Sequence, residues 1–420
     1  MDLVHALTPT NVTSSMLAPS LSCKGDRLEV RRLCLHKSAL QSAVTHIKQR
    51  NCAQIGYARH EGEIQPELCF NKTSEKMELG GSPCPAEGMC TLAYCTDLSN
   101  VILVSKGGVM EMRRLGQSGL HVSLVGLGCN NFGARLDIEG TRGVIHRALD
   151  RGITLFDTSD SYSDGISESQ IGHILGARRK DIVLASKFGS PMGPGVMQRG
   201  GSRHYIMQAV EASLKRLQTD WIDLYQFHRP DPATPLEETL RALDDLVRQG
   251  KVRYIGISNH PAWRVVESLW IAKQNGLNAF VTCQDEYSLL SRQIEAELVP
   301  AMQANGLGLL PYFPLASGLL TGKYHEDQPP QAGTRFAGNG RFKSRYWTKE
   351  NWHKVTALEA YAKQHGQSLL TLAFSWLAAQ TCVSSIIAGA TKPEQIDGNV
   401  EAVNWVLTAQ DLTHIDQITR

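Results

Sequence analysis

The sequence of 420 residues lacks several features that would place it in a class of protein at once. It contains no clean apolar run of about 18 residues, so we expect no membrane-spanning helix. Its first residues (MDLVHALTPTNVTSSMLAPS) lack a basic start followed by a sustained apolar stretch, which argues against a secretory signal. The net charge is only +2, so charge predicts neither nucleic acid nor a membrane as a partner. We therefore expect a globular cytoplasmic protein.

Cysteine is scarce in most of the chain and concentrated near its start. Ahead of residue 110 lie Cys23, Cys34, Cys52, Cys69, Cys84, Cys90 and Cys95, and only Cys129, Cys283 and Cys382 follow. None of the early cysteines forms a C-x2-C pair, the tight spacing that zinc ribbons and fingers commonly use. We therefore predict no metal site.

The same early segment has little periodic hydrophobicity. Only residues 38–50 suggest a helix, through Leu40, Val44 and Ile47 at helical spacing. The hydrophobic pattern of the sequence becomes periodic near residue 110, and residues 113–121 are typical of a hairpin around a Gly/Ser turn. We therefore divide the chain into residues 1–109 and 110–420. The first part is interpreted as a disordered extension or as a segment foreign to the natural protein, such as one produced by a misassigned start codon.

The second part is typical of repeated strand–helix units. The strand candidates are residues 122–126, 153–157, 182–187, 222–228, 254–258, 279–284, 308–312 and 385–388. Amphipathic helical patterns lie between them, as in residues 204–217 and 239–250. This alternation predicts an α/β fold, a (β/α)8 TIM barrel with an N-terminal hairpin, and leaves a doubly wound sheet as the alternative.

The glycines after the first strand test that alternative. Gly126 and Gly128 begin like a dinucleotide-binding fingerprint, but Asn131 stands where its third glycine is required. The fingerprint therefore fails, and a tight turn at the mouth of a barrel is the better interpretation.

Four polar residues lie at or just beyond the ends of three of the expected strands: Asp157, Tyr162, Lys187 and His228. In a parallel barrel such strand ends converge on one mouth. Each residue alone has an ordinary role, such as a helix cap or a solvated charge. Together they amount to a proton-transfer unit, in which a phenol donates a proton, an ammonium stabilises the phenolate, a carboxylate holds the ammonium and an imidazole orients a carbonyl.

Several widely spaced motifs add a resemblance. They are FDTSDSY (156–162) with Ser167 and Glu168, ASK (185–187), SLKRLQTDWIDLY (213–225) leading to His228, GKVRYIGISN (250–259) and PLASGLLTGKY (314–324). In this order they resemble the aldo-keto reductase superfamily over residues 112–420, especially its bacterial and aryl-alcohol-dehydrogenase-like members. Residues 1–109 have no counterpart in that family.

The resemblance implies a catalytic tetrad of Asp157, Tyr162, Lys187 and His228. It also implies a site for NADP(H), with NAD(H) as the alternative. The expected cofactor-binding residues are Ser258, Asn259, Gln284, Tyr312, Leu315, Ser317, Gly318, Leu319, Lys323, Gly389, Ala390, Thr391, Lys392, Gln395 and Asn399. The implied activity is reduction of small aldehydes or ketones. A nicotinamide-binding regulatory subunit like the potassium-channel β subunits, and a sugar or aryl-alcohol dehydrogenase, remain as alternatives.

The chemistry of the four residues supports this assignment. A free tyrosine has a pKa of about 10 and donates its proton poorly at neutral pH. We expect Lys187 to lower the pKa of Tyr162, and Asp157 to keep Lys187 charged and in place. For the substrate pocket we expect loops near Asn130, Phe132, Phe188 and Trp263 together with residues 324–352, while substrate and oligomeric state stay open.

Overall fold

A computed structural model describes residues 23–24, 27–28, 54–60, 63–69, 92–95, 100–105, 108–338 and 340–420, with side chains from Met110 onward. By its contacts the chain divides into two compact units, Met1–Glu87 and Gly88–Arg420. The helix expected at residues 38–50 lies outside the described residues, as do Cys34, Cys52, Cys84 and Cys90.

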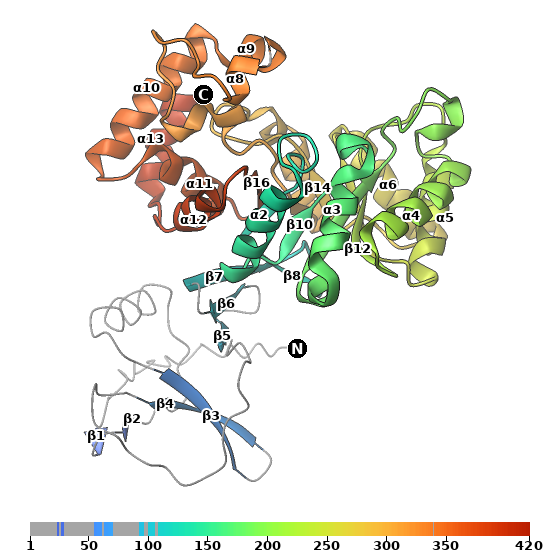
Figure 1. Cartoon of the computed structure of the whole chain (residues 1–420), viewed down its shortest axis with the longest axis horizontal. Coiled ribbons are helices and arrows are strands. Elements are labelled where there is room, and N and C mark those ends of the chain that lie inside the picture. Colours follow the sequence, from blue (N-terminus) through green and yellow to red (C-terminus); the bar gives the residue numbers. More distant parts are fainter. Residues whose placement is uncertain are drawn as a thin grey trace, which may run out of the picture. The chain divides into compact units, whose positions relative to one another are not determined.

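The described part of the first unit is a four-stranded antiparallel sheet in the order β1-β2-β4-β3 (Figure 1). Its strands are β1 (Cys23–Lys24), β2 (Arg27–Leu28), β3 (Gln54–His60) and β4 (Glu63–Cys69). The sequence did not indicate these strands, and Pro66 within β4 is a residue that strand interiors generally exclude. Most of residues 1–109 lies outside the described ranges, so the predicted unstructured extension and its boundary stay predictions.

The second unit begins with another antiparallel sheet, formed by β5 (Leu92–Cys95), β6 (Asn100–Ser105), β7 (Gly108–Arg114) and β8 (His121–Ser123). The hairpin predicted at residues 113–121 is confirmed, because Arg114 pairs with His121 across the turn between β7 and β8. Gly116 in this turn has φ +60, and a Cβ there would lie 2.5 Å from the carbonyl oxygen of Val281. Glycine therefore lets the hairpin approach the barrel closely.

Eight parallel strands form the barrel, in the order β15-β14-β13-β12-β11-β10-β9-β16. They are β9 (Val125–Gly128), β10 (Leu155–Asp157), β11 (Val183–Phe188), β12 (Ile222–Phe227), β13 (Val252–Ser258), β14 (Thr282–Gln284), β15 (Gly308–Leu309) and β16 (Ile386–Gly389). Leu309 closes the ring, since its N–H donates to Cys382 and its carbonyl accepts from Ser384. The predicted barrel is confirmed and the doubly wound sheet is excluded. The strand expected at residues 122–126 is in fact two, because β8 ends at Ser123 and β9 begins at Val125.

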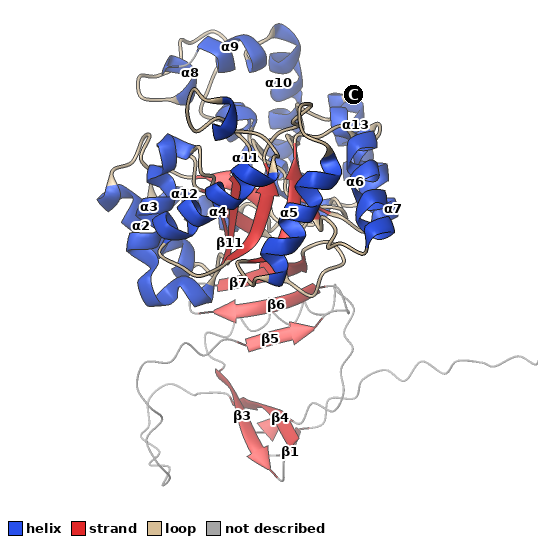
Figure 2. Ribbon diagram, turned by 90° about the vertical axis from the view of Figure 1, so that its right-hand side faces the viewer, coloured by secondary structure: helices blue, strands red, loops and turns tan. Residues whose placement is uncertain are grey.

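Helices alternate with these strands and surround them (Figure 2). They are α2 (Ile138–Asp150), α3 (Ile166–Leu175), α4 (Arg203–Leu217), α5 (Leu236–Arg248), α6 (Ala262–Asn275), α7 (Leu298–Asn305), α8 (Arg335–Gly338), α9 (Gly340–Tyr346), α10 (Lys349–Gln364), α11 (Leu369–Ala379), α12 (Pro393–Glu401) and α13 (Ala409–Thr419). Among the described residues no helix is both long and apolar enough to cross a membrane.

The interior of the barrel has an apolar layer at the end that the hairpin covers. Leu115 and Val122 from the hairpin segment are fully buried there. They join one cluster with Leu155, Val183, Ala185, Leu224, Leu310 and Ile387, which come from the barrel strands and the segments beside them. Because side chains alternate along a strand, the next inward positions lie two residues further, toward the opposite mouth.

Candidate active site

The four residues predicted to be catalytic lie at that opposite mouth. Asp157 ends β10, Lys187 is the penultimate residue of β11, and His228 follows β12 directly. Tyr162 begins a short 3-10 turn, Tyr162–Gly165, in the loop after β10. The barrel topology therefore brings together side chains that are up to 71 positions apart in the sequence, as between Asp157 and His228.

Lys187 is the centre of this group and is completely buried. Its Nζ donates to Asp157 Oδ2 at 2.6 Å, to the carbonyl oxygen of Thr158 at 2.8 Å and to the hydroxyl of Tyr162 at 3.2 Å. The three donors of the ammonium are thus all used, and one of them is directed at the phenol.

The electrostatics follow from burial and pairing. Burial by itself would lower the pKa of Lys187, but Asp157 and Tyr162 outweigh it and raise that pKa, so the side chain stays charged. For Tyr162 our expectation needs correction. Lys187 does lower the pKa of the phenol, but burial is the larger effect and the net pKa is raised. Tyr162 therefore holds its proton at neutral pH.

His228 is held in its neutral form. Burial, and then the charges of Lys187 and Arg229, lower the pKa of His228 to about 2. Its Nδ1 lies 3.3 Å from Ser159 Oγ and 3.1 Å from Ser190 Oγ. A neutral imidazole can donate from one ring nitrogen while it accepts at the other.

The sequence did not reveal one member of the polar layer, Gln226. Its Nε2 donates to Asp157 Oδ1 at 3.0 Å, and Nε2 of Gln284 donates to the same oxygen at 2.8 Å. Asp157 is therefore fixed by two amides as well as by Lys187. The only available signal was position, because Gln226 lies two residues beyond the inward-facing Leu224 on β12.

Three predicted nicotinamide-binding residues are linked to one another and to the tetrad. Ser258 Oγ accepts from Asn259 Nδ2 at 2.9 Å, and the same Nδ2 donates to the carbonyl oxygen of His228 at 3.0 Å. The Tyr312 hydroxyl donates to Asn259 Oδ1 at 2.7 Å. Asn259 has φ +62, a strained conformation that asparagine tolerates and that is frequent in binding sites. Gln284, the fourth of these residues, uses its amide nitrogen on Asp157 instead.

The predicted pyrophosphate loop has an unusual backbone. Ser317 and Gly318 have φ of +59 and +104, inside the 3-10 segment Ala316–Thr321. The hydroxyl of Ser317 is buried and has no hydrogen-bond partner among the described residues. Leu319 is buried in the core, so only its backbone can face a ligand, whereas Lys323 is exposed and Leu315 half-buried. An orphaned hydroxyl in a strained loop fits a phosphate ligand.

The predicted adenosine end lies at the start of α12. Thr391 donates its N–H to Gln395 Oε1 at 2.7 Å. Lys392 is the exposed N-cap residue of this helix and makes no capping hydrogen bond through its side chain. The remaining predicted residues surround this point: Gly389 is exposed, while Ala390 and Asn399 are buried.

The substrate pocket stays a prediction. Phe132 and Phe188 are fully buried in the core, so the loops beside them, and not their rings, would border a pocket. Trp263 is 63% exposed at the start of α6. In the segment 324–352, Arg345 is paired with Glu286. The guanidinium of Arg335 lies over the Phe313 and Phe342 rings, and burial followed by nearby Arg135 lowers its pKa. Arg335 forms no ion pair with any residue that the structure describes, so it favours an anion at this point.

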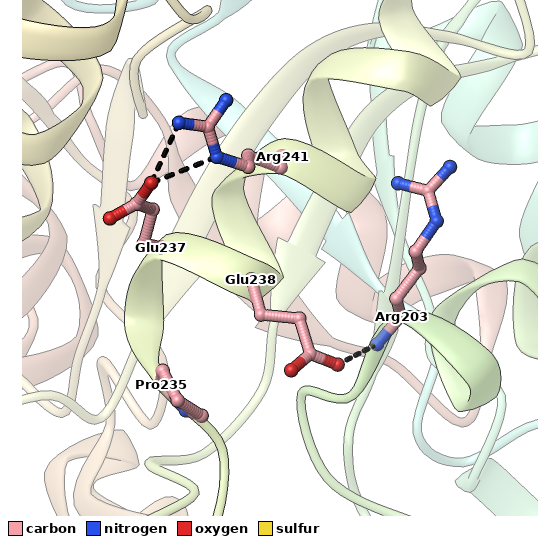
Figure 3. Close-up of a pocket in the computed structure, with 5 residues that line it drawn as sticks. All are labelled: Arg203, Pro235, Glu237, Glu238 and Arg241. Carbon is pink, nitrogen blue, oxygen red and sulfur yellow. Dashed lines mark hydrogen bonds and ion pairs between the residues drawn. The ribbon is translucent and has the colours of Figure 1, made fainter.

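A hollow on the outside of the barrel is a poorer candidate (Figure 3). It is lined by Arg203, Pro235, Glu237, Glu238 and Arg241. Its acidic groups already have partners, since Glu237 pairs with Arg241 and Glu238 accepts from the N–H of Arg203. None of the described residues that line this hollow is strained or has an unsatisfied buried group, unlike those at the mouth.

Two other kinds of chemistry find little support in the described part of the chain. It contains no cluster of three or more histidine, cysteine or acidic residues that could hold a metal. Cys129, Cys283 and Cys382 are free and buried, and burial raises the pKa of each thiol. None is therefore an activated nucleophile.

The sequence of this chain is similar to those of a family of known proteins. Residues 124–420 match the sequence model described as the aldo/keto reductase family. The L-glyceraldehyde 3-phosphate reductase of Escherichia coli (strain K12) is 34% identical over 74% of this chain and 92% of its own. A probable voltage-gated potassium channel subunit beta of Arabidopsis thaliana is 36% identical over 74% of this chain and 96% of its own. The uncharacterized oxidoreductase YrpG of Bacillus subtilis (strain 168) is 37% identical, with shares of 74% and 96%.

A parallel barrel with a buried group of Lys187, Tyr162 and Asp157 at its mouth is the arrangement that this family match joins to an oxidoreductase class. The chain belongs to the aldo/keto reductase family, an oxidoreductase family whose members generally use a nicotinamide cofactor.

Proposed function

We propose that the protein is an NADPH-dependent reductase that converts small aldehydes or ketones to alcohols, with Tyr162 as the general acid. The observation that carries this proposal is the buried Lys187 ammonium, which lies 2.6 Å from Asp157 and 3.2 Å from the Tyr162 hydroxyl. We further propose that it acts in the cytoplasm on small-molecule carbonyls, without a nucleic-acid or membrane partner.

Each residue then has one task. The nicotinamide, when bound, supplies the hydride. Tyr162 donates its proton to the oxygen of the carbonyl as negative charge develops there, and Lys187 stabilises the phenolate that remains. Asp157 keeps Lys187 charged, and neutral His228 donates a hydrogen bond that orients the carbonyl. General acid catalysis of this kind contributes about 10²–10⁴-fold.

The predicted cofactor residues fit this role. Asn259 and Tyr312 are joined by a hydrogen bond beside the tetrad, where the nicotinamide is needed. The hydroxyl of Ser317, which has no hydrogen-bond partner among the described residues, suits the pyrophosphate. Lys392 at the N-terminus of α12 suits the 2′-phosphate of NADPH, because the first N–H groups of a helix and its dipole attract anions.

A nicotinamide-binding regulatory subunit is the second candidate. The observation in its favour is that the relative named as a potassium channel subunit beta matches as much of this chain as the reductase does, 74% in both cases. A sugar or aryl-alcohol dehydrogenase would use the same four residues in the oxidative direction.

A panel of aldehydes and ketones, followed by the absorbance of NADPH and of NADH, tests the proposal. We expect turnover with NADPH that Tyr162→Phe abolishes. Tight NADPH binding without turnover of any carbonyl or alcohol would favour the regulatory subunit instead.

A further inference from the structure

A closed network of buried polar groups lies around Nδ1 of His228. Ser159 Oγ lies 3.3 Å and Ser190 Oγ 3.1 Å from this nitrogen. The Ser159 hydroxyl also lies 3.1 Å from Asp160 Oδ1 and 3.0 Å from the Ser161 hydroxyl, and it accepts from the backbone N–H of Ser161. The Tyr205 hydroxyl completes the network, at 3.2 Å from Asp160 Oδ2 and 3.3 Å from the carbonyl oxygen of Ser190. One hydroxyl therefore separates the carboxyl of Asp160 from the imidazole.

Asp160 is only 1% exposed and has no cationic partner among the residues that the structure describes. The nearby cations are already used, since Arg216 pairs with Glu168 at 2.7 Å and Lys187 pairs with Asp157. The titratable and charged groups around Asp160 are Glu168 from α3, Tyr205 and Arg216 from α4, and Tyr225 from β12. Burial, and then the Glu168 carboxylate, raise the pKa of Asp160 to about 7.

The protons of this network can be counted. When Asp160 is ionised it only accepts, so the single proton of the Ser159 hydroxyl points to Asp160. Ser159 Oγ then offers His228 a lone pair, and the Ser190 hydroxyl, 3.1 Å from Nδ1, can rotate to accept as well, so a proton on Nδ1 is favoured. When Asp160 carries a proton it can donate to Ser159, and Ser159 can donate to Nδ1 of His228. A neutral imidazole with Nδ1 as acceptor has its proton on Nε2.

We propose that Asp160 is a positioning residue that sets the tautomer of His228 through the Ser159 hydroxyl. Protonated Asp160 keeps the proton of His228 on Nε2, for which the structure records no partner among the described residues. Ionised Asp160 moves it to Nδ1. No bond to carbon forms or breaks in this step, and one proton leaves to solvent.

The consequence for catalysis rests on the proposed reductase function. Only the Nε2–H tautomer can donate a hydrogen bond to the substrate carbonyl while Nδ1 faces the serines. Reduction should therefore fall as the pH rises through about 7, well below the pH at which the raised pKa of Tyr162 removes its proton. The expected decrease is about tenfold, the effect of one hydrogen bond.

The tautomer can be measured without turnover. The full chain, with its 14 histidines labelled with 15N, gives long-range 1H–15N correlations in which protonated and unprotonated ring nitrogens differ widely in chemical shift. His228→Asn identifies the signal of interest. We expect the Nε2–H form at pH 6 and the Nδ1–H form at pH 8.5, with a midpoint near the pKa of Asp160, about 7.

Two variants interrupt the hydrogen-bond relay from Asp160 through Ser159 to His228 at different points. Asp160→Asn keeps an amide donor toward Ser159 at every pH, so His228 should stay in the Nε2–H form. The decrease in the rate of reduction near pH 7, called the step below, should then vanish. Ser159→Ala leaves Asp160 in place but removes the link, and it should also abolish the step. Ser159→Ala keeps the test valid if Asp160→Asn does not fold.

Asp285→Asn is the matched control. Burial raises the pKa of Asp285 to about 8, but its carboxyl has no recorded contact with His228, Ser159 or Ser190. This variant should keep the step near pH 7. A His228 tautomer that does not change between pH 6 and 8.5, or that still changes in Asp160→Asn or Ser159→Ala, overturns the proposal. Because the spectra need no substrate, the relay can fail or hold independently of the reductase function.

Discussion

The two ends of the barrel interior are built from the same strands and have opposite chemistry. Three pairs of residues show this, each two positions apart on one strand: Leu155 and Asp157, Ala185 and Lys187, and Leu224 and Gln226. The first member of each pair lies in the apolar layer under the hairpin, and the second lies in the polar layer at the mouth. Within about 7 Å of strand length, the interior changes from a hydrophobic core to a buried ion pair.

The two layers should therefore serve different properties of the protein, the apolar layer its stability and the polar layer its activity. The apolar layer stabilises the fold, because each buried aliphatic side chain gains about 1.5–3 kcal/mol on leaving water. The polar layer gains little, because desolvation of Asp157 and Lys187 offsets most of their attraction. What the mouth gains instead is a charge held in place beside a phenol. Changes at the two ends should therefore affect different measurements.

Lys187→Met should have the largest effect, because it damages both properties. It leaves Asp157 as an uncompensated buried charge, which costs about 3–5 kcal/mol of the free energy of unfolding. It also raises the pKa of Tyr162 further, so reduction should fall sharply at neutral pH. Asp157→Asn should slow reduction less, because it only loosens the ammonium. Denaturant titration measures the free energy of unfolding, and a pH–rate profile measures the reduction. An unchanged pH–rate profile in Lys187→Met would show that the lysine does not act on Tyr162.

Leu224→Ala tests the apolar end alone. It should lower the free energy of unfolding by about 2–5 kcal/mol through lost burial and the cavity left behind. The turnover number should stay near that of the parent, because Leu224 belongs to the layer beneath the tetrad. Urea unfolding and initial rates at saturating substrate check this. A turnover loss as large as that of a mouth variant would mean that the two layers are not separable.

Tyr162→Phe tests the mouth alone. The hydroxyl is lost but the ring is kept, so the melting temperature should change little. Turnover should fall at least about 10²-fold, the low end for general acid catalysis. NADPH binding, followed by quenching of intrinsic fluorescence, should persist. Parent-like reduction by this variant would contradict the assigned role of Tyr162.

Lys392→Ala concerns the cofactor and leaves both layers intact. We expect the parent to favour NADPH over NADH, and the variant to narrow that preference about tenfold, equivalent to roughly 1.4 kcal/mol. Gln395 accepts from Thr391 and adds no positive charge, so the preference should be modest. The ratio of kcat/KM for the two cofactors measures it. Equal use of both by the parent would defeat the prediction without affecting the tetrad.

Removal of residues 1–109 should have the smallest effect. A chain that begins at Met110 retains every barrel strand and the whole mouth, so its specific activity should match that of the full chain. It loses β5, β6 and the first two residues of β7, which pairs with β6, and a chain that begins at Gly88 is therefore the matched control for stability. Thermal melting of both, beside the full chain, is the measurement. A large loss of rate in the shorter chain would show that the removed segment contributes to the site.

Much of the fold was predictable because the signals were local. Short apolar strands, amphipathic helices such as α5, and the Gly/Ser turn before β8 each indicate their structure within a few residues. The burial of a side chain was not predictable where it depends on distant partners. Phe132 and Phe188 belong to loops or strand ends near the mouth, yet their rings pack into the core. The break between β8 and β9 is equally invisible locally, because one apolar run supplies both strands.

The order of the residues along the chain establishes which side chains stand at the ends of the barrel strands, and so which of them can meet at one mouth. Periodicity and motif spacing were sufficient for that, because they depend on chain geometry alone. Which polar groups bind one another depends instead on how the barrel closes. Gln226 and Ser190 have no distinguishing sequence pattern, and barrel closure places them within hydrogen-bond distance of Asp157 and His228, respectively. Burial also reversed the expected pKa shift of Tyr162, since desolvation depends on everything that surrounds a group and not on its partner alone.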